Sequence, residues 1–88
     1  MVFKPNVKKL KGKQDIGGLL RALQYRKEDS VRWEAADALG ELEDPVAINS
    51  LIQALEDRHW RVRSSAAVAL GIIGDSEAVE VLIKLVDH

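Results

Sequence analysis

The chain has 88 residues, 47% of them hydrophobic and 31% charged, which predicts one globular domain close to the smallest size that supports its own core. It has no cysteine, so disulfides, thiolate metal sites and cysteine nucleophiles are excluded. A net charge of -1 gives no overall attraction to nucleic acids or acidic membranes.

The first 28 residues predict a short, loosely built pair of helices. No apolar stretch follows the lysines at the start, and no window has the roughly 18 apolar residues of a membrane span, so we expect a cytoplasmic protein.

Asn6 is placed to cap one turn, and Asp15 to cap a helix whose apolar residues are Ile16, Leu19, Leu20 and Leu23. Residues 1–28 are therefore interpreted as an N-terminal capping half repeat.

The rest of the sequence is one unit copied twice. Residues 31–57 align without a gap on residues 62–88, and eleven of the 27 positions are identical. The identical positions are mostly apolar or turn-forming, whereas the mismatches are mostly polar. This pattern is typical of a structural repeat whose surface varies.

Each copy is expected to fold as two antiparallel helices. In the first copy, one apolar stripe contains Val31, Ala35, Ala38, Leu39 and Leu42, and a second contains Ala47, Ile48, Leu51, Ile52 and Leu55. Between them Asp44 is placed to cap the second helix and Pro45 to occupy its first turn.

In the second copy Gly74 takes the position that ends the first helix, and Asp75 or Ser76 the cap. We therefore predict an all-α fold, a short α-α superhelix of about two and a half helix pairs, with repeats at 29–59 and 60–88 of a single domain, residues 1–88.

The motifs V-R, A-A-x-A-L-G and A-V-x-x-L-I recur in the sequence. From Ser30 to Leu85 it resembles the short HEAT-like repeats of the phycobilin-lyase class. Two departures are Glu43, where that class usually has glycine, and Asp29 with Trp60, where proline is common. The class includes scaffolds, chromophore lyases and hydroxylases, so the resemblance implies a fold rather than one activity.

No catalytic or metal site is expected. The hydroxylases that the sequence resembles hold iron with His-Glu pairs, whereas here His59 precedes Trp60 and His88 is the last residue. Ser64 and Ser65 have no partnering histidine in a recognisable arrangement. We therefore expect no enzyme activity, no metal and no cofactor.

Arg32 and Arg63 occupy the same place in the two copies. A guanidinium that reaches a turn carboxylate or free carbonyls there would link successive units, so Arg63→Ala is expected to lower the melting temperature by several degrees.

Helical repeats usually bind partners on the side lined by their second helices. The polar positions on that side, together with Trp33, are the predicted partner-binding residues, whereas Trp60 is expected to cover the join between units. The partner-binding set is Arg21, Tyr25, Trp33, Asn49, Ser50, Gln53, Asp57, Glu80, Val81 and Lys84.

The second copy is more apolar than the first at equivalent positions, since Asp37, Glu41 and Ser50 become apolar. An apolar end predicts that further repeats or a second copy of the chain cover it. The predicted oligomer interface is Val68, Ile72, Val81, Leu85 and Val86.

The leading functional hypothesis is a non-catalytic interaction or scaffold module with a protein or peptide partner. One alternative, taken from the resemblance, is a bilin-lyase-like subunit that handles a chromophore. Another is nucleic-acid binding by the lysine-rich start with Arg21, Arg26, Lys27 and Arg32, which the net charge disfavours.

Overall fold

The computed structural model describes the backbone of residues 3–86 and the side chains of residues 3–75. This part of the chain contains helices and no strand. Its elements are α1 (Val7–Gly12), α2 (Ile16–Ala22), α3 (Asp29–Leu42), a 3-10 turn at Pro45–Ala47, α4 (Ile48–Ala54) and α5 (Trp60–Val86). The predicted all-α class is confirmed.

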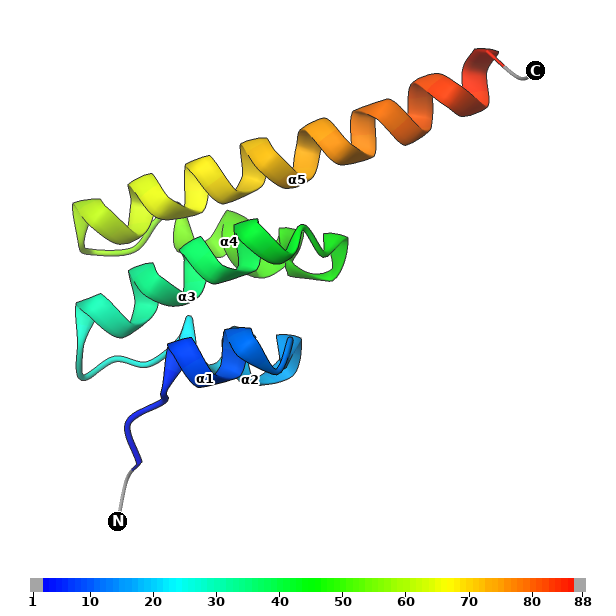
Figure 1. The fold of residues 1–88 in the computed structure, drawn as a ribbon. Helices are drawn as coiled ribbons and strands as arrows, with labels where there is room; N and C mark the ends of the chain where they lie inside the picture. The colour runs from blue at the N-terminus through cyan, green and yellow to red at the C-terminus, as the bar shows by residue number, and fades with distance from the viewer. Residues whose placement is uncertain (1–2, 87–88) are drawn as a thin grey trace.

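The helices are stacked in layers (Figure 1). Helices α1 and α2 form the first layer, α3 and α4 the second, and α5 lies over both helices of the second layer. Helix α3 is the centre of the stack, because it contacts α1 and α2 on one side and α5 on the other. This is the arrangement of a helical solenoid, in which each unit contacts its neighbours.

Three predicted helix caps are present, and they set where the short helices begin. Asn6 and Asp15 each accept a hydrogen bond from the backbone N–H three residues further on, at 3.1 and 2.8 Å. Asp44 accepts one from the N–H of Val46 at 3.0 Å, and Pro45 occupies the first turn after it. These bonds satisfy N–H groups that have no partner within the helix.

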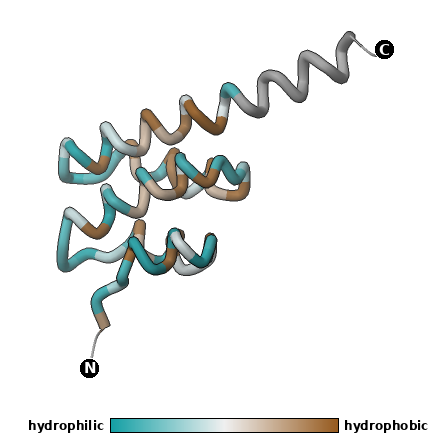
Figure 2. Tube along the Cα trace, viewed as in Figure 1, coloured by the Kyte–Doolittle hydropathy of each residue, from teal (hydrophilic) through white to brown (hydrophobic). Residues whose placement is uncertain are grey.

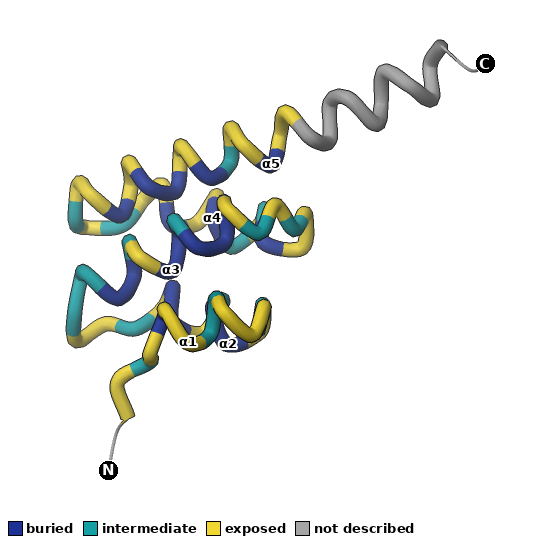
Figure 3. Tube along the Cα trace, viewed as in Figure 1, coloured by how far each residue is buried: buried dark blue, intermediate teal, exposed yellow. Residues whose placement is uncertain are grey.

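Small residues allow α3 and α5 to approach closely. A Cβ atom added to Gly40 of α3 would lie only 2.9 Å from the Cα atom of Ala69 in α5. Figure 3 shows buried positions along the side of α5 that faces α3, and Figure 2 shows apolar residues recurring there. The core that results contains Leu19, Val31, Ala35, Ala36, Leu39, Leu51, Val62, Ala66 and Ile73, all fully or almost fully buried.

The predicted stripe of the fourth helix is partly wrong. Leu51 and Ala47 are fully buried, but Ile52 is 50% exposed and Leu55 is 37% exposed. Ala54 is buried instead. The helix is only seven residues long and is entered through a 3-10 turn, whose three residues per turn do not keep the 3.6-residue period that the predicted stripe assumed.

The turn predicted inside the second copy is absent, because α5 runs without a break from Trp60 to Val86. In the first copy the helix ends where Glu43 adopts a left-handed conformation, φ 53°, and Pro45 follows. No glycine of the described backbone has a positive φ, Gly74 included. The second copy also has Ser76 where the first has Pro45, so no residue there removes a backbone N–H and forces the helix to stop.

The ends of the layers are tied together by one buried arginine. The Arg32 side chain is fully buried. Its Nε and Nη2 atoms donate to the two carboxylate oxygens of Asp57, at 2.9 and 3.1 Å, and Nη1 donates to the Tyr25 carbonyl at 2.8 Å. Nη2 also donates to Asp29. One guanidinium thereby connects the end of α2, the first turn of α3 and the loop between α4 and α5.

Asp57 completes this network from the other side. Its Oδ1 accepts the backbone N–H of His59 at 2.9 Å, just before α5 begins, and its side chain is only 4% exposed. Burial alone would raise the pKa of Asp57, but the hydrogen bonds from Arg32 and His59 and the Arg32 charge outweigh it, so the pKa is lowered. The hydrogen bond to Asp57 is the largest cause of a raised pKa at Arg32, so both partners are held in their charged forms.

Arg63 makes a contact of the kind predicted for it, a hydrogen bond to a free carbonyl, but a weaker one than Arg32 makes. Its Nη1 donates to the Asp57 carbonyl oxygen at 2.8 Å, but the side chain is exposed. The arginine that links units from the inside is therefore Arg32, and its carboxylate partners are Asp57 and Asp29.

Removing the Arg32 side chain should be far more damaging than removing that of Arg63. Arg32→Ala leaves Asp57 buried without its partner, and breaking a buried ion pair in this way costs about 3–5 kcal/mol. Arg63→Ala removes one exposed hydrogen bond, which contributes roughly 1 kcal/mol or less. Urea unfolding followed by circular dichroism measures both losses.

Arg32→Lys serves if the alanine variant does not fold, since lysine keeps the charge but not the two parallel hydrogen bonds. It should lie between the wild type and Arg32→Ala in the free energy of unfolding. Equal losses for Arg63→Ala and Arg32→Lys would show that the buried network has no special role.

Candidate functional site

A groove of about 460 Å³ lies between α2 and α4, the second helices of the first two layers. Its apolar lining is Leu23 and Ala54, both buried, and its polar lining comes from α4 and from the loops that follow α2 and α4. The polar residues are Gln24, Arg26, Ser50, Gln53, Glu56 and Asp57. The groove thus lies on the side of the stack where partner binding was predicted.

Ser50, Gln53 and Asp57 are the predicted site residues that the structure brings together in this groove. For Asp57 the environment differs from the expected one, because its carboxylate is held by Arg32 rather than turned to a partner. Asp57 therefore forms part of the groove wall without offering a free carboxylate to a partner.

The other described members of the predicted strip lie apart from the groove lining. Arg21 and Asn49 are exposed on α2 and α4. Tyr25 is half-buried, packs against the core, and contributes its carbonyl to Arg32. The side chains of Glu80, Val81 and Lys84 lie outside the described residues.

Sequence reasoning missed Gln24, Arg26 and Glu56, which line one end of the groove. These residues follow the apolar stripes of α2 and α4 directly, where a helix ends and the chain turns back. Their position next to Tyr25 and Asp57 could have indicated them, since the ends of stacked helices meet at a common edge.

The two tryptophans are exposed in the opposite order to that expected. Trp33 is partly buried against the core, its ring centroid is 5.2 Å from that of His59, and the Arg61 guanidinium lies 5.6 Å from its centre. Trp60 is 63% exposed, although it was expected to cover a join between units. A helix start that faces outward explains its exposure.

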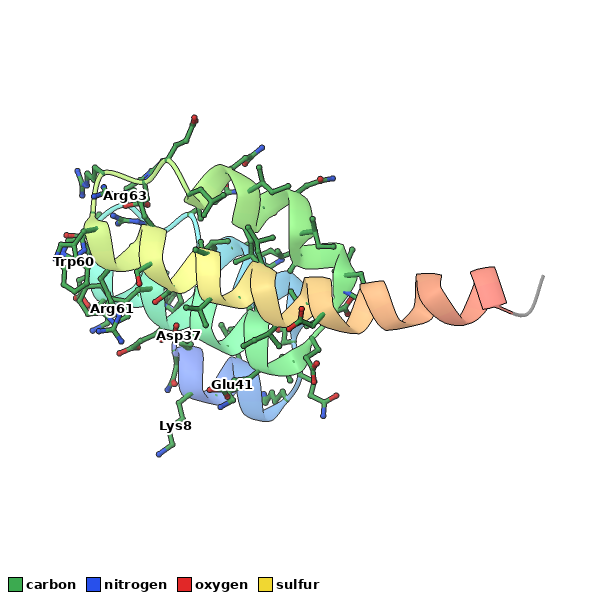
Figure 4. All side chains as sticks on the ribbon, turned by 90° about the horizontal axis from the view of Figure 1, so that it is seen from above. Lys8, Asp37, Glu41, Trp60, Arg61 and Arg63 are labelled. Atoms are coloured by element: carbon green, nitrogen blue, oxygen red, sulfur yellow. The ribbon has the colours of Figure 1, made fainter. Side chains whose placement is uncertain are left out.

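The described part of the predicted oligomer interface is exposed. Val68 is 59% and Ile72 38% exposed, and both line a shallow hollow between α3 and α5 together with Asp37 and Glu41. Figure 4 shows the two acidic residues on this side of the stack. The side chains of Val81, Leu85 and Val86 lie outside the described residues.

Several cations of the proposed nucleic-acid surface are already engaged. Lys4 pairs with Glu28 at 2.9 Å, and this hydrogen bond is the largest cause of a lowered pKa at Glu28 and a raised pKa at Lys4. Lys11 pairs with Glu41. Arg32 is buried and bound to two carboxylates.

His59 is occupied by local contacts. Its Nδ1 accepts the backbone N–H of Arg61 at 3.0 Å, and its Nε2 lies 4.0 Å from Asp29. Among the described residues, no three histidine or acidic side chains gather as metal ligands would. The described helices also include none with the length and apolar character needed to cross a membrane.

Comparison with known proteins identifies relatives of several kinds. The chain is 37% identical over 76 residues to a phycocyanobilin lyase subunit alpha of Picosynechococcus sp., covering 80% of this chain and 28% of that protein. It is 33% identical over 86 residues to a HEAT repeat-containing taxis protein of Halobacterium salinarum, covering 96% of this chain and 20% of that protein. A deoxyhypusine hydroxylase of Aspergillus clavatus is 46% identical over 55 residues, 60% of this chain and 16% of the enzyme.

These relatives contradict the prediction that the chain has no enzyme activity. A lyase subunit and a hydroxylase are named among them, so enzymes are built from repeats of this kind. We had expected no activity because the sequence has no recognisable set of catalytic residues. The chain spans less than a third of the length of each of these relatives. Catalytic residues in the rest of such a protein could not be recognised from this stretch of repeats.

The family model described as HEAT repeats matches residues 16–88, which include the second helix of the first layer and everything after it. The match covers far more than half of the sequence and agrees with the stacked helices. The chain therefore belongs to the HEAT repeat family.

Proposed function

We propose that this chain is a recognition module that holds a peptide segment of a partner protein in the groove between α2 and α4. The observation that carries the proposal is the groove itself, a polar-rimmed depression of about 460 Å³ formed by α4 and the loops that follow α2 and α4. HEAT repeats commonly mediate protein interactions, and stacked repeats present such surfaces for binding. A cytoplasmic setting belongs to the same proposal.

The chemistry of the lining suits an extended peptide. The side-chain amides of Gln24 and Gln53 each offer donors and an acceptor, which match the N–H and C=O groups of a peptide backbone. Leu23 and Ala54, of which little is exposed, form a small apolar floor that a partner side chain can contact. Arg26 and Glu56 lie at the same end and can orient the partner by charge.

Filling the groove should abolish this binding. Peptides selected from a display library against the wild-type chain should bind Gln53→Trp at least about tenfold more weakly, because an indole would occupy the space of the peptide. Fluorescence anisotropy of the selected peptides measures the difference.

Ser64→Trp is the matched control, since Ser64 is an exposed position on α5 that does not line the groove. Selected peptides should bind this variant like the wild type. If no peptide is enriched, or if both tryptophan variants bind equally well, the groove is not a peptide site.

A second candidate is chromophore handling, which the similarity to the phycocyanobilin lyase subunit favours. A groove of this volume falls in the range of small-molecule sites, and Arg26 could pair with a carboxylate of a bilin.

The test is an absorbance scan of phycocyanobilin mixed with the chain. A bound bilin should show a shifted and sharpened absorption band that Gln53→Trp removes and Ser64→Trp keeps. A spectrum equal to that of free phycocyanobilin would reject this candidate and leave the peptide proposal standing.

A further inference from the structure

Two loops bring four arginines and an exposed tryptophan to one end of the molecule. Arg26 lies in the loop between α2 and α3, Arg58 in the loop between α4 and α5, and Arg61 and Arg63 in the first turn of α5. Arg58 Nη2 donates to the Arg26 carbonyl at 3.0 Å, which joins the two loops. Figure 4 shows Trp60, Arg61 and Arg63 together at the start of α5. We call these five residues the arginine edge.

The arginine edge carries an excess of positive charge. Its acidic neighbours are Asp29 and Asp57, which both pair with Arg32, and Glu56, which lines the groove together with Arg26. Arg26 lies 3.5 Å from the Asp57 carboxylate and Arg58 lies 3.6 Å from that of Asp29. With Arg61 and Arg63, five arginines face these three acidic residues, an excess of two positive charges in a chain whose net charge is -1.

Folding alone would not favour this arrangement. The N-terminal end of a helix carries a partial positive charge and is stabilised by acidic residues in its first turn. The first turn of α5 has no acidic residue and contains Arg61 and Arg63 instead. Two exposed cations at this position cost stability, which a negatively charged partner would recover.

Trp60 adds an apolar surface among these charges. It is 63% exposed, and the His59 ring is stacked beside it with centroids 5.9 Å apart. Because the indole is supported on one side and open to solvent on the other, it offers a fixed flat surface without contributing to the core. Exposed aromatic residues beside arginines are the composition of energetically important contact sites.

We propose that the arginine edge binds an acidic segment of a partner protein, with an apolar side chain of that segment packed on Trp60. A short acidic segment fits better than a nucleic acid, since the positive charge is confined to one end. Exposed Glu34 on α3 would repel a long polyanion that continued past it. This surface is separate from the Gln53 part of the groove.

A fluorescein-labelled peptide of alternating glutamate and leucine is a suitable probe. Fluorescence anisotropy should show binding to the wild-type chain that weakens as salt increases. The double variant Arg61→Glu/Arg63→Glu should bind at least about tenfold more weakly, and Trp60→Ala should also bind more weakly. Because the new acids suit the start of α5, the double variant should melt no more than a few degrees below the wild type.

Lys8→Glu/Lys9→Glu is the matched control, because it makes the same change in net charge on exposed positions of α1. This variant should retain the peptide affinity, and so should Gln53→Trp, whose failure would concern only the groove. Equal loss in the lysine and arginine variants would overturn the proposal. So would an oligothymidine probe that binds with arginine dependence while the acidic peptide does not bind.

Discussion

The buried contact between Arg32 and Asp57 is the interaction on which the rest of this structure depends. A small helical stack has little apolar surface to bury, and its loops would be its weakest parts. Here one guanidinium with no exposed surface bonds the end of α2, the start of α3 and the loop before α5. The successive layers are therefore held at their loops by hydrogen-bonded charges as well as at their faces by apolar packing.

This contact also explains why two candidate binding surfaces share one end of the molecule. By holding the loops in place, it fixes Arg26 at the end of the groove and brings Arg26 next to Arg58. By neutralising Asp29 and Asp57, it leaves Arg61 and Arg63 without an acidic counterpart from those residues. The same buried pair thus holds the loops in position and leaves the arginine edge positively charged.

Local rules predicted much of this fold, and tertiary contacts decided the rest. The caps at Asn6, Asp15 and Asp44 follow from residue type, and Pro45 accounts for the break after α3. The continuous α5 was missed because an aspartate after a glycine permits a turn without requiring one. The Asp57 partner of Arg32 could not be read from the sequence, since the two are 25 residues apart and a surface role for Asp57 fitted the same pattern. Of the groove, α4 and the three polar residues Ser50, Gln53 and Asp57 were predictable, whereas Gln24, Arg26 and Glu56 in the loops depend on how the layers stack.

The most direct measurement is the difference in unfolding free energy between the wild type and Asp57→Asn as a function of pH. The folded-state pKa of Asp57 is lowered from an unfolded value of about 3.9, so the ionised pair contributes its stability above that value and loses it as pH falls through the folded pKa. The difference should be large at neutral pH and shrink below about pH 4, while Asp37→Asn, at a half-buried position of α3, should show only a small difference at neutral pH. A difference for Asp57→Asn that is negligible at neutral pH, or that does not change down to acid pH, would contradict the account.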